Sequence, residues 1–168
     1  MRYGFTTGSC ATAASKAATY MLLTGKLKQN ITIQTPKGIL FHAEILEITR
    51  SEKEVTCAVK KDGGDDPDIT SGALIFSTVS FADEEEKTSK QHNGQLSGIC
   101  VEAMQEKQAV IHIDGGKGVG RVTKPGLDQP VGNAAINHVP REMIEKEVQE
   151  VCALADFCGV LHITISVP

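Results

Sequence analysis

The sequence has no tryptophan, and aromatic residues make up only 4% of its 168 residues. A stacking platform for single-stranded nucleic acid depends on aromatic rings, so this composition argues against one. Positive charge is not in excess either, because the formal net charge is -4 at pH 7. A protein that binds nucleic acid by neutralising phosphates needs a basic surface. We therefore expect no nucleic-acid partner.

Long apolar segments and paired cysteine motifs are also missing. No apolar run approaches the roughly 20 residues that cross a bilayer, and the N-terminus lacks the apolar core of a signal peptide. We expect a cytoplasmic protein with no membrane partner. The cysteines are odd in number and form no C-x-x-C pair, which predicts neither a zinc site nor a redox motif. Buried free thiols are the expectation for Cys10, Cys57, Cys100, Cys152 and Cys158.

The remaining composition is that of a globular protein, with 40% hydrophobic and 23% charged residues. Apolar periodicity predicts helices at residues 9–23, 96–107 and 140–158, the first capped by Thr7 or Ser9. Alternation predicts strands at 31–35, 39–48, 55–59, 73–81, 109–113 and 160–167, with a bulge or bend near Leu46. Strands come in runs, which favours an α+β fold: a mostly antiparallel or mixed sheet packed by two to three helices.

The start of the first helix is a candidate binding segment. It reads Gly4-Phe5-Thr6-Thr7-Gly8-Ser9-Cys10 and leads into an alanine-rich run. Hydroxyl groups and unpaired N–H groups at a helix start suit an anion. The alternative is an ordinary capped helix, because threonine and serine are common caps.

An acidic turn follows the third predicted strand, with Asp62, Asp65, Asp66 and Asp68 close together. Such carboxylates could bind a divalent cation, although the spacing does not match an EF-hand loop. They could also act as a general base or hold cationic groups of a ligand. Turn chemistry is the structural alternative, because Gly-Gly and Asp-Pro pairs punctuate loops.

A glycine-rich segment, Asp114 to Leu127, follows the strand at 109–113. It contains Gly116, Gly118 and Gly120, but a dinucleotide fingerprint needs a longer last gap and an immediate helix. The cations Lys117, Arg121 and Lys124 beside flexible backbone amides suit a ligand with carboxylates or phosphates. A hairpin tip with solvated lysines is the alternative.

Four ordered motifs give the sequence a specific resemblance. They are GFTTGSCATAASKAA (4–18), KDGGDDPDITSGA (61–73), GGKGVGRVTKPGL (115–127) and PVGNAAINHVPREMI (130–144). Together they closely resemble the cobalt-precorrin-5B C(1)-methyltransferase family of anaerobic cobalamin biosynthesis. The resemblance is to the N-terminal half of that family, with residues 83–108 as an atypical insertion and the C-terminal domain absent. We expect residues 1–168 to form one domain.

The resemblance implies methyl transfer from S-adenosylmethionine to C-1 of a corrinoid precursor, with cobalt arriving only within this tetrapyrrole substrate. It leaves a homo-oligomer open. We expect Asp65, Asp66 and Asp68 to be catalytic, and Gly116, Gly118 and Gly120 to contact the methyl donor. The residues expected to bind substrate carboxylates are Thr6, Thr7, Ser9, Lys117, Arg121 and Lys124.

Two other functions stay open at this stage. A non-catalytic tetrapyrrole-binding module would need the same carboxylate-binding residues but no methyl donor. A hydrolase would use Thr6, Thr7 or Cys10 as nucleophile, and it is disfavoured because no partner base is identifiable.

Overall fold

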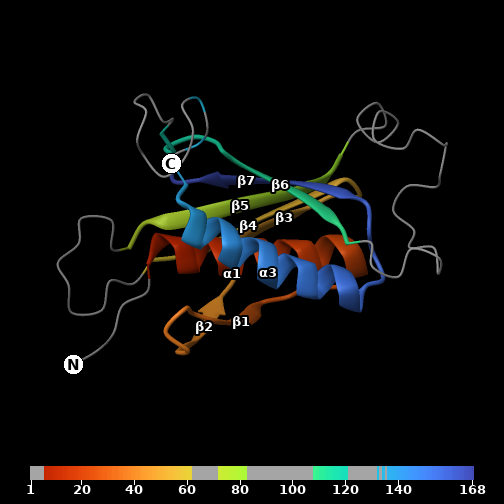
Figure 1. The fold of residues 1–168 in the computed structure, drawn as a ribbon, viewed down its shortest axis with the longest axis horizontal. Coiled ribbons are helices and arrows are strands. Elements are labelled where there is room, and N and C mark those ends of the chain that lie inside the picture. Colours follow the sequence, from red (N-terminus) through yellow and green to blue (C-terminus); the bar gives the residue numbers. More distant parts are fainter. Residues whose placement is uncertain (1–5, 62–71, 83–107, 121–131, 133, 135) are drawn as a thin grey trace.

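The computed structural model describes residues 6–61, 72–82, 108–120, 132, 134 and 136–168. Two helices and two sheets make up an α+β fold, which confirms the predicted class. The two helices lie side by side against one face of the larger sheet, and a two-stranded hairpin lies on their other side (Figure 1). The elements are α1 (Thr7–Thr24), β1 (Asn30–Gln34), β2 (Leu40–Glu44), β3 (Leu46–Arg50), β4 (Glu54–Lys60), β5 (Leu74–Phe81), β6 (Val110–Gly115), α3 (His138–Leu154) and β7 (Val160–Ser166).

The larger sheet has the strand order β3-β4-β5-β7-β6. Its first four strands are antiparallel neighbours, whereas β6 and β7 pair in parallel. Parallel neighbours need a crossover, and α3 lies within the connection between these two strands. The sheet is therefore mixed, and its parallel strands and crossover helix form a β–α–β unit. The helix predicted at 96–107 lies outside the described residues.

The predicted strand at 39–48 is two strands in two different sheets. β2 pairs with β1 from Leu40 opposite Gln34 to Glu44 opposite Asn30, whereas β3 pairs with β4. The expected slip in alternation lies where the chain passes between the sheets. The register shifts after Leu46, and Glu47 has φ 51°, which is uncommon for a residue with a side chain. The slip thus marks a change of pairing partner.

The start of α1 and the end of α3 differ from the prediction. The cap of α1 is Thr6, since the Ser9 amide donates to Thr6 Oγ1 at 3.0 Å. The helix therefore starts about one turn earlier than it would with Ser9 as its cap. The helix ends as expected, because Gly25 takes the left-handed conformation (φ 72°) and its amide donates to Met21 O. α3 stops at Leu154, before Gly159, and Asp156 (φ 59°) turns the chain toward β7.

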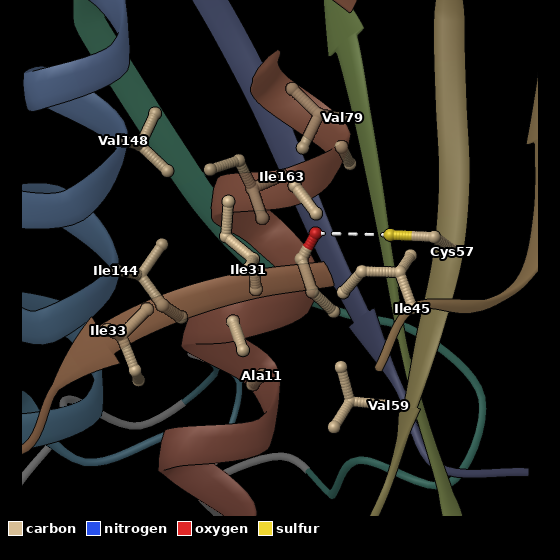
Figure 2. Packing of buried hydrophobic residues seen from close by; sticks show 14 of the residues in the cluster. Ala11, Ile31, Ile33, Ile45, Cys57, Val59, Val79, Ile144, Val148 and Ile163 are labelled. Carbon is tan, nitrogen blue, oxygen red and sulfur yellow. Dashed lines mark hydrogen bonds between the residues drawn. The ribbon is translucent and has the colours of Figure 1, made fainter. Parts of the chain in front are cut away.

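Helix α1 occupies the centre of the structure. Eleven of its 18 residues are buried, and the run from Ser9 to Ser15 is buried without interruption. A surface helix buries one stripe, as α3 does with Ile144, Val148 and Val151, so an uninterrupted run means contacts on nearly all sides. The alanines of α1 face apolar side chains from the sheet, from α3 and from the hairpin (Figure 2). Small residues allow these three neighbours to approach the helix backbone closely.

Polar groups of this helix are paired inside the core. The hydroxyls of Ser15 and Ser77 are 2.8 Å apart, which ties α1 to the middle of β5. The Cys57 thiol on β4 donates to Ala14 O at 3.2 Å, the contact drawn as a dashed line in Figure 2. Each bond removes the penalty that an unpaired buried polar group would carry. The bonds therefore also fix which face of α1 meets the sheet.

A buried ion pair joins the two helices to the hairpin. Lys16 Nζ of α1 lies 3.0 Å from Glu147 Oε1 of α3 and donates to Thr32 O of β1 at 3.1 Å. The side chains of Lys16 and Glu147 are only 15% and 8% exposed. Removing one partner of such a pair leaves a charge buried without compensation. The pair thus holds three elements in one relative position.

The glycine segment after β6 continues the parallel pairing with β7. The Gly116 amide donates to Ile165 O, and the Val167 amide donates to Lys117 O, each at 2.8 Å. Gly118 has φ 82°, and a Cβ there would overlap the carbonyl of Val167. A glycine is therefore required at residue 118 both by its dihedral angle and by the close approach of β7.

We expect Gly118→Ala to lower the free energy of unfolding by about 1–3 kcal/mol, because the alanine is strained and collides with backbone. Urea unfolding measures the change. Gly120→Ala is the matched control, since a Cβ at Gly120 meets no atom of the described residues within 4 Å. It should be neutral or stabilise by up to about 1 kcal/mol. Equal effects of the two substitutions would contradict the close approach at Gly118.

We expect Lys16→Met to destabilise the protein by about 3–5 kcal/mol, because it leaves Glu147 ionised and buried without its partner. The double variant Lys16→Met/Glu147→Met removes both charges and should recover most of that loss. Urea unfolding of wild type, both single variants and the double variant gives the coupling energy between the two sites. Additive losses in the double variant would show that the pair contributes nothing to stability.

Candidate functional site

Three segments that are distant in the sequence meet at one cavity of about 300 Å³, here called the helix-start cavity. One wall comes from the start of α1, a second from the glycine segment after β6, and a third from the segment that leads into α3. The lining residues are Thr7, Gly8, Ala11, Gly118, Val119, Gly120, Ile136, Asn137, Pro140, Ile165 and Val167. Parts of three of the four motifs found in the sequence therefore line a single space.

Both helices begin at this cavity because they run parallel to each other. A Cβ at Gly8 would lie 3.0 Å from Pro140 Cγ, so the first turns of α1 and α3 are in close contact. The Lys16–Glu147 pair joins the same helices about two turns further along. Figure 1 shows the two helices side by side with their first turns at the same end. The positive ends of two helix dipoles thus lie next to each other.

These helix starts favour an anion. The first backbone hydrogen bond of α1 runs from the Cys10 amide to Thr6 O, and the Thr6 hydroxyl oxygen accepts a hydrogen bond from the Ser9 amide. The amides of Thr7 and Gly8 come before that first bond and have no acceptor within the helix. Neither helix has an acidic residue in its first turn. A ligand carboxylate at the cavity would therefore meet backbone donors and two dipoles of favourable sign.

The sheet side of the cavity is the carboxyl end of the β6–β7 pair. Gly118 and Gly120 follow β6, and Val167 follows β7, so both parallel strands end here. In sheets with crossover helices, ligands bind beyond the carboxyl ends of parallel strands, where helix starts converge. The fold thus places the sequence-predicted segments where the geometry of a β–α–β unit favours a small anionic ligand.

The predicted substrate-binding residues have different positions around this cavity. Thr7 lines it, whereas Thr6 caps the helix and its hydroxyl donates to Oγ of the buried Ser9 at 3.1 Å. Lys117 is exposed on the glycine segment. Arg121 and Lys124 lie outside the described residues.

The predicted glycines and aspartates also differ in where they lie. Gly118 and Gly120 line the cavity, but Gly116 packs on β7, where a Cβ would lie 2.6 Å from Ser166 Oγ. The expected catalytic residues Asp65, Asp66 and Asp68 lie outside the described residues. The structure therefore brings the start of α1 and the glycine segment together at one cavity. The catalytic role of the three aspartates stays a prediction.

Sequence reasoning missed Arg141, which organises the wall of the cavity. Its Nε donates to Ile136 O at 2.7 Å, Nη2 to Ala134 O at 3.1 Å, and Nη1 to Ile113 O of β6 at 3.3 Å. One side chain thus ties the segment before α3 to the edge of the sheet. The signal was available, because Arg141 follows Pro140 within the fourth motif, but its partners are backbone carbonyls that a sequence pattern does not reveal.

The described cysteines are poor nucleophiles. Burial raises the pKa of Cys57 to about 12, and burial together with Glu145 raises the pKa of Cys152 to about 11. Cys10 is likewise a buried thiol. Cys158 is disulfide-bonded, which contradicts the expectation of a free thiol at that position. A low thiol pKa and an accessible sulfur, which covalent chemistry needs, are both missing at Cys57 and Cys152.

The described residues contain no group of three or more histidine, cysteine, aspartate or glutamate side chains able to hold a metal ion. No helix among them combines the length and apolar character that a bilayer crossing demands.

Comparison with known proteins gives consistent matches. The protein in Geobacillus kaustophilus (strain HTA426) named cobalt-precorrin-5B C(1)-methyltransferase is 45% identical over 168 residues. Proteins of the same name are 46% identical in Thermoanaerobacter sp. (strain X514) and 40% identical in Picrophilus torridus. The match covers 99–100% of this chain but 38–42% of those three relatives. The chain thus spans about two fifths of their length.

A solved structure shares the fold. The crystal structure of the cobalamin biosynthesis protein CbiD from Archaeoglobus fulgidus superposes with a TM-score of 0.59 at 22% identity, covering 98% of this chain and 43% of that one. The family model described as CbiD matches residues 1–168. These matches confirm the resemblance carried by the four motifs, and the chain belongs to the CbiD family.

Proposed function

We propose that this chain is the N-terminal, substrate-facing part of an enzyme that methylates C-1 of cobalt-precorrin-5B in cobalamin biosynthesis. The observation that carries the proposal is family membership over the whole chain, together with relatives of that name at about 45% identity. The relatives are longer, so the complete reaction belongs to the longer protein. S-adenosylmethionine is the proposed methyl donor.

Methyl transfer of this kind depends mainly on how the two reactants are positioned relative to each other. The electron-rich ring carbon forms a bond to the methyl group as the carbon–sulfur bond of the sulfonium breaks, and S-adenosylhomocysteine leaves. The positive charge passes to the ring, which then releases one proton to solvent. No covalent enzyme intermediate is needed. Holding the two reactants in line can supply roughly 7–11 kcal/mol of the lowering of the barrier. The task of this chain is then to hold a large, carboxylate-bearing ring in one orientation.

The helix-start cavity suits one peripheral carboxylate of that ring. At about 300 Å³ it is small for a whole macrocycle, but it has room for an acetate or propionate side chain. The amides of Thr7 and Gly8 would donate to the carboxylate, and Lys117 would contribute charge from the exposed glycine segment. Each such contact is worth only about 0.3–1 kcal/mol, so several must act together. Arg121 and Lys124 are proposed as further contacts of the same kind.

The remaining assignments are part of the same proposal. Asp65, Asp66 and Asp68 would serve the reacting centre as charged groups, because turn chemistry by itself does not call for three aspartates around Pro67. Gly116, Gly118 and Gly120 would approach the methyl donor. The close packing of Gly116 and Gly118 on β7 gives these two glycines a structural task as well.

A turnover assay with the full protein that carries this chain tests the function. With S-adenosylmethionine and cobalt-precorrin-5B, we expect S-adenosylhomocysteine and a corrinoid heavier by one methylene group. Lys117→Ala should raise KM about two- to fivefold at low ionic strength, because a carboxylate contact is lost. Lys37→Ala, an exposed lysine in the β1–β2 turn, makes the same charge change away from the cavity and should leave KM unchanged.

The rival function is a tetrapyrrole-binding module without catalysis. It predicts tight binding of the tetrapyrrole, no calorimetric signal with S-adenosylmethionine and no methylated product. That set of results would overturn the proposed reaction. Equal KM values for Lys117→Ala and Lys37→Ala, with normal turnover, would remove Lys117 from the substrate site.

A further inference from the structure

A second cavity, of about 470 Å³, lies between the β1–β2 hairpin and α3 and is here called the hairpin cavity. One wall is the end of β1 with the turn that follows it, and the other is one face of α3. Figure 1 shows the hairpin beside the helices, on the side away from the larger sheet. The residues of the α3 face recur at helical spacing: Val139, Glu142, Met143, Lys146 and Glu147. The volume is typical of a site for a small molecule, and the proposed methyl transfer uses none of these residues.

Glu147 presents a buried carboxylate oxygen to this cavity. The residue is only 6% exposed, and its Oε1 pairs with Lys16 Nζ at 3.0 Å. Within the described part of the chain, no donor bonds to Glu147 Oε2. No fully buried side-chain oxygen there lacks a partner, so Oε2 keeps some access to the cavity that Glu147 lines. A carboxylate accepts several hydrogen bonds, and this one therefore has room for a donor from a ligand.

Two charges of opposite sign lie on the same face of α3. Glu142 and Lys146 are exposed and one turn apart, a spacing at which glutamate and lysine often pair. Among the described residues, neither forms an ion pair with the other or with any further side chain. Lys146 thus offers an ammonium group, and Glu142 a carboxylate, to a ligand in the cavity.

The hairpin wall is ordered and adds one more polar group. The Thr35 amide donates to Ile39 O at 2.9 Å, and the amide of Gly38, which has φ 83°, donates to Thr35 O at 2.8 Å. These bonds fix the turn that faces α3. Gln34, at the end of β1, has an exposed carboxamide to which no described residue bonds. Its N–H groups and its oxygen are therefore available to a ligand.

Apolar side chains complete the lining. Pro36 comes from the hairpin turn, and Val139 and Met143 come from α3. Val139 is 41% exposed, whereas Met143 is partly buried and packs against the core. A flexible thioether adapts to the shape of an apolar group that lies on it. The cavity thus offers apolar surface beside its charged groups.

The charges at the hairpin cavity sum to zero. Lys16 compensates Glu147, and Lys146 offsets Glu142. A simple ion of either sign would be attracted by one of the two exposed charges and repelled by the other. A small zwitterion, with an ammonium and a carboxylate on one carbon, can satisfy both. Glu147 Oε2 and Glu142 suit its ammonium, while Lys146 and the carboxamide of Gln34 suit its carboxylate.

We propose that the hairpin cavity binds the ammonium and carboxylate groups of an α-amino acid with an apolar side chain. The ammonium donates to Glu147 Oε2, the carboxylate accepts from Lys146, and the side chain lies on Val139 and Met143. Two sources share this chemistry, namely a free amino acid and the methionyl end of S-adenosylmethionine. The site itself does not rest on the proposed function, and only the second source does.

Calorimetry of the full protein that carries this chain, with L-methionine at low ionic strength, tests the site. Methionine methyl ester lacks the carboxylate and N-acetylmethionine lacks the ammonium, so both should bind more weakly than methionine. Lys146→Ala should weaken binding of methionine about two- to fivefold but should not weaken binding of the ester. Glu142→Gln should weaken binding of methionine to a similar extent but should not weaken binding of N-acetylmethionine. Both side chains are exposed, so thermal unfolding should show an unchanged Tm.

The controls make the same charge changes outside the lining of the cavity. Lys26→Ala and Glu150→Gln alter exposed side chains and should leave the affinity for methionine unchanged. Equal affinity of wild type, Lys146→Ala and Glu142→Gln for methionine would overturn the site, and so would absence of methionine binding to the wild type. The proposed methyl transfer would then still stand on its turnover assay.

A competition titration identifies the source of the amino acid. Displacement of methionine by S-adenosylmethionine, with weaker binding of S-adenosylmethionine to Lys146→Ala, would assign the site to the methyl donor. Methionine binding without competition would assign it to a free amino acid. In that second case, failure of the turnover assay would overturn the proposed function and leave the site in place.

Discussion

The burial of α1 on nearly all sides is the constraint on which the rest of this structure depends. Its central residues are alanines, serines and threonines, which fill little space and let backbones come close. The sheet packs on one side, while α3 and the hairpin close the others (Figure 1). A larger side chain in place of one of the buried alanines would push two layers apart. The small residues therefore set the distances between all the layers.

A helix buried in this way has to satisfy its polar groups internally. The Ser15–Ser77 contact and the Lys16–Glu147 pair do so, and each also selects one neighbour in one position. Hydrophobic contacts between alanine side chains do not fix the orientation of a helix, because they are not directional. Buried hydrogen bonds and ion pairs do fix it, because each needs one partner in one position. The orientation of α1 thus comes from a few polar contacts, and the free energy of packing comes mainly from the apolar surface around them.

The parallel arrangement of α1 and α3 has an electrostatic consequence. Two helix starts side by side bring like partial charges together, which is unfavourable unless an anion or water compensates. Gly8 against Pro140 keeps the starts in contact, and the ion pair further along holds the helices in register. The fold thus maintains an anion-favouring end that faces the carboxyl ends of β6 and β7.

The sequence by itself determined the α+β class, the family and most of the secondary structure among the described residues. Alternation in β7 and the apolar stripe of α3 depend on neighbours in the chain, so a local pattern suffices to predict them. The four motifs were enough for the family. The helix-start and glycine segments were also recognised as candidates, and both reach one cavity. The roles of Asp65, Asp66 and Asp68 remain predictions from the sequence.

Only the tertiary structure decided which strands pair and which motifs meet. The segment at 39–48 alternates with period two in both of its strands, so its pattern cannot show that they join different sheets. Thr6 rather than Ser9 caps α1, because nearby hydroxyls offer similar caps and packing selects among them. Arg141 donates to backbone carbonyls, and because every residue has one, the sequence does not show which carbonyls it will reach. These features come from contacts between segments distant in the chain, whose free energy is gained only when the layers pack around α1.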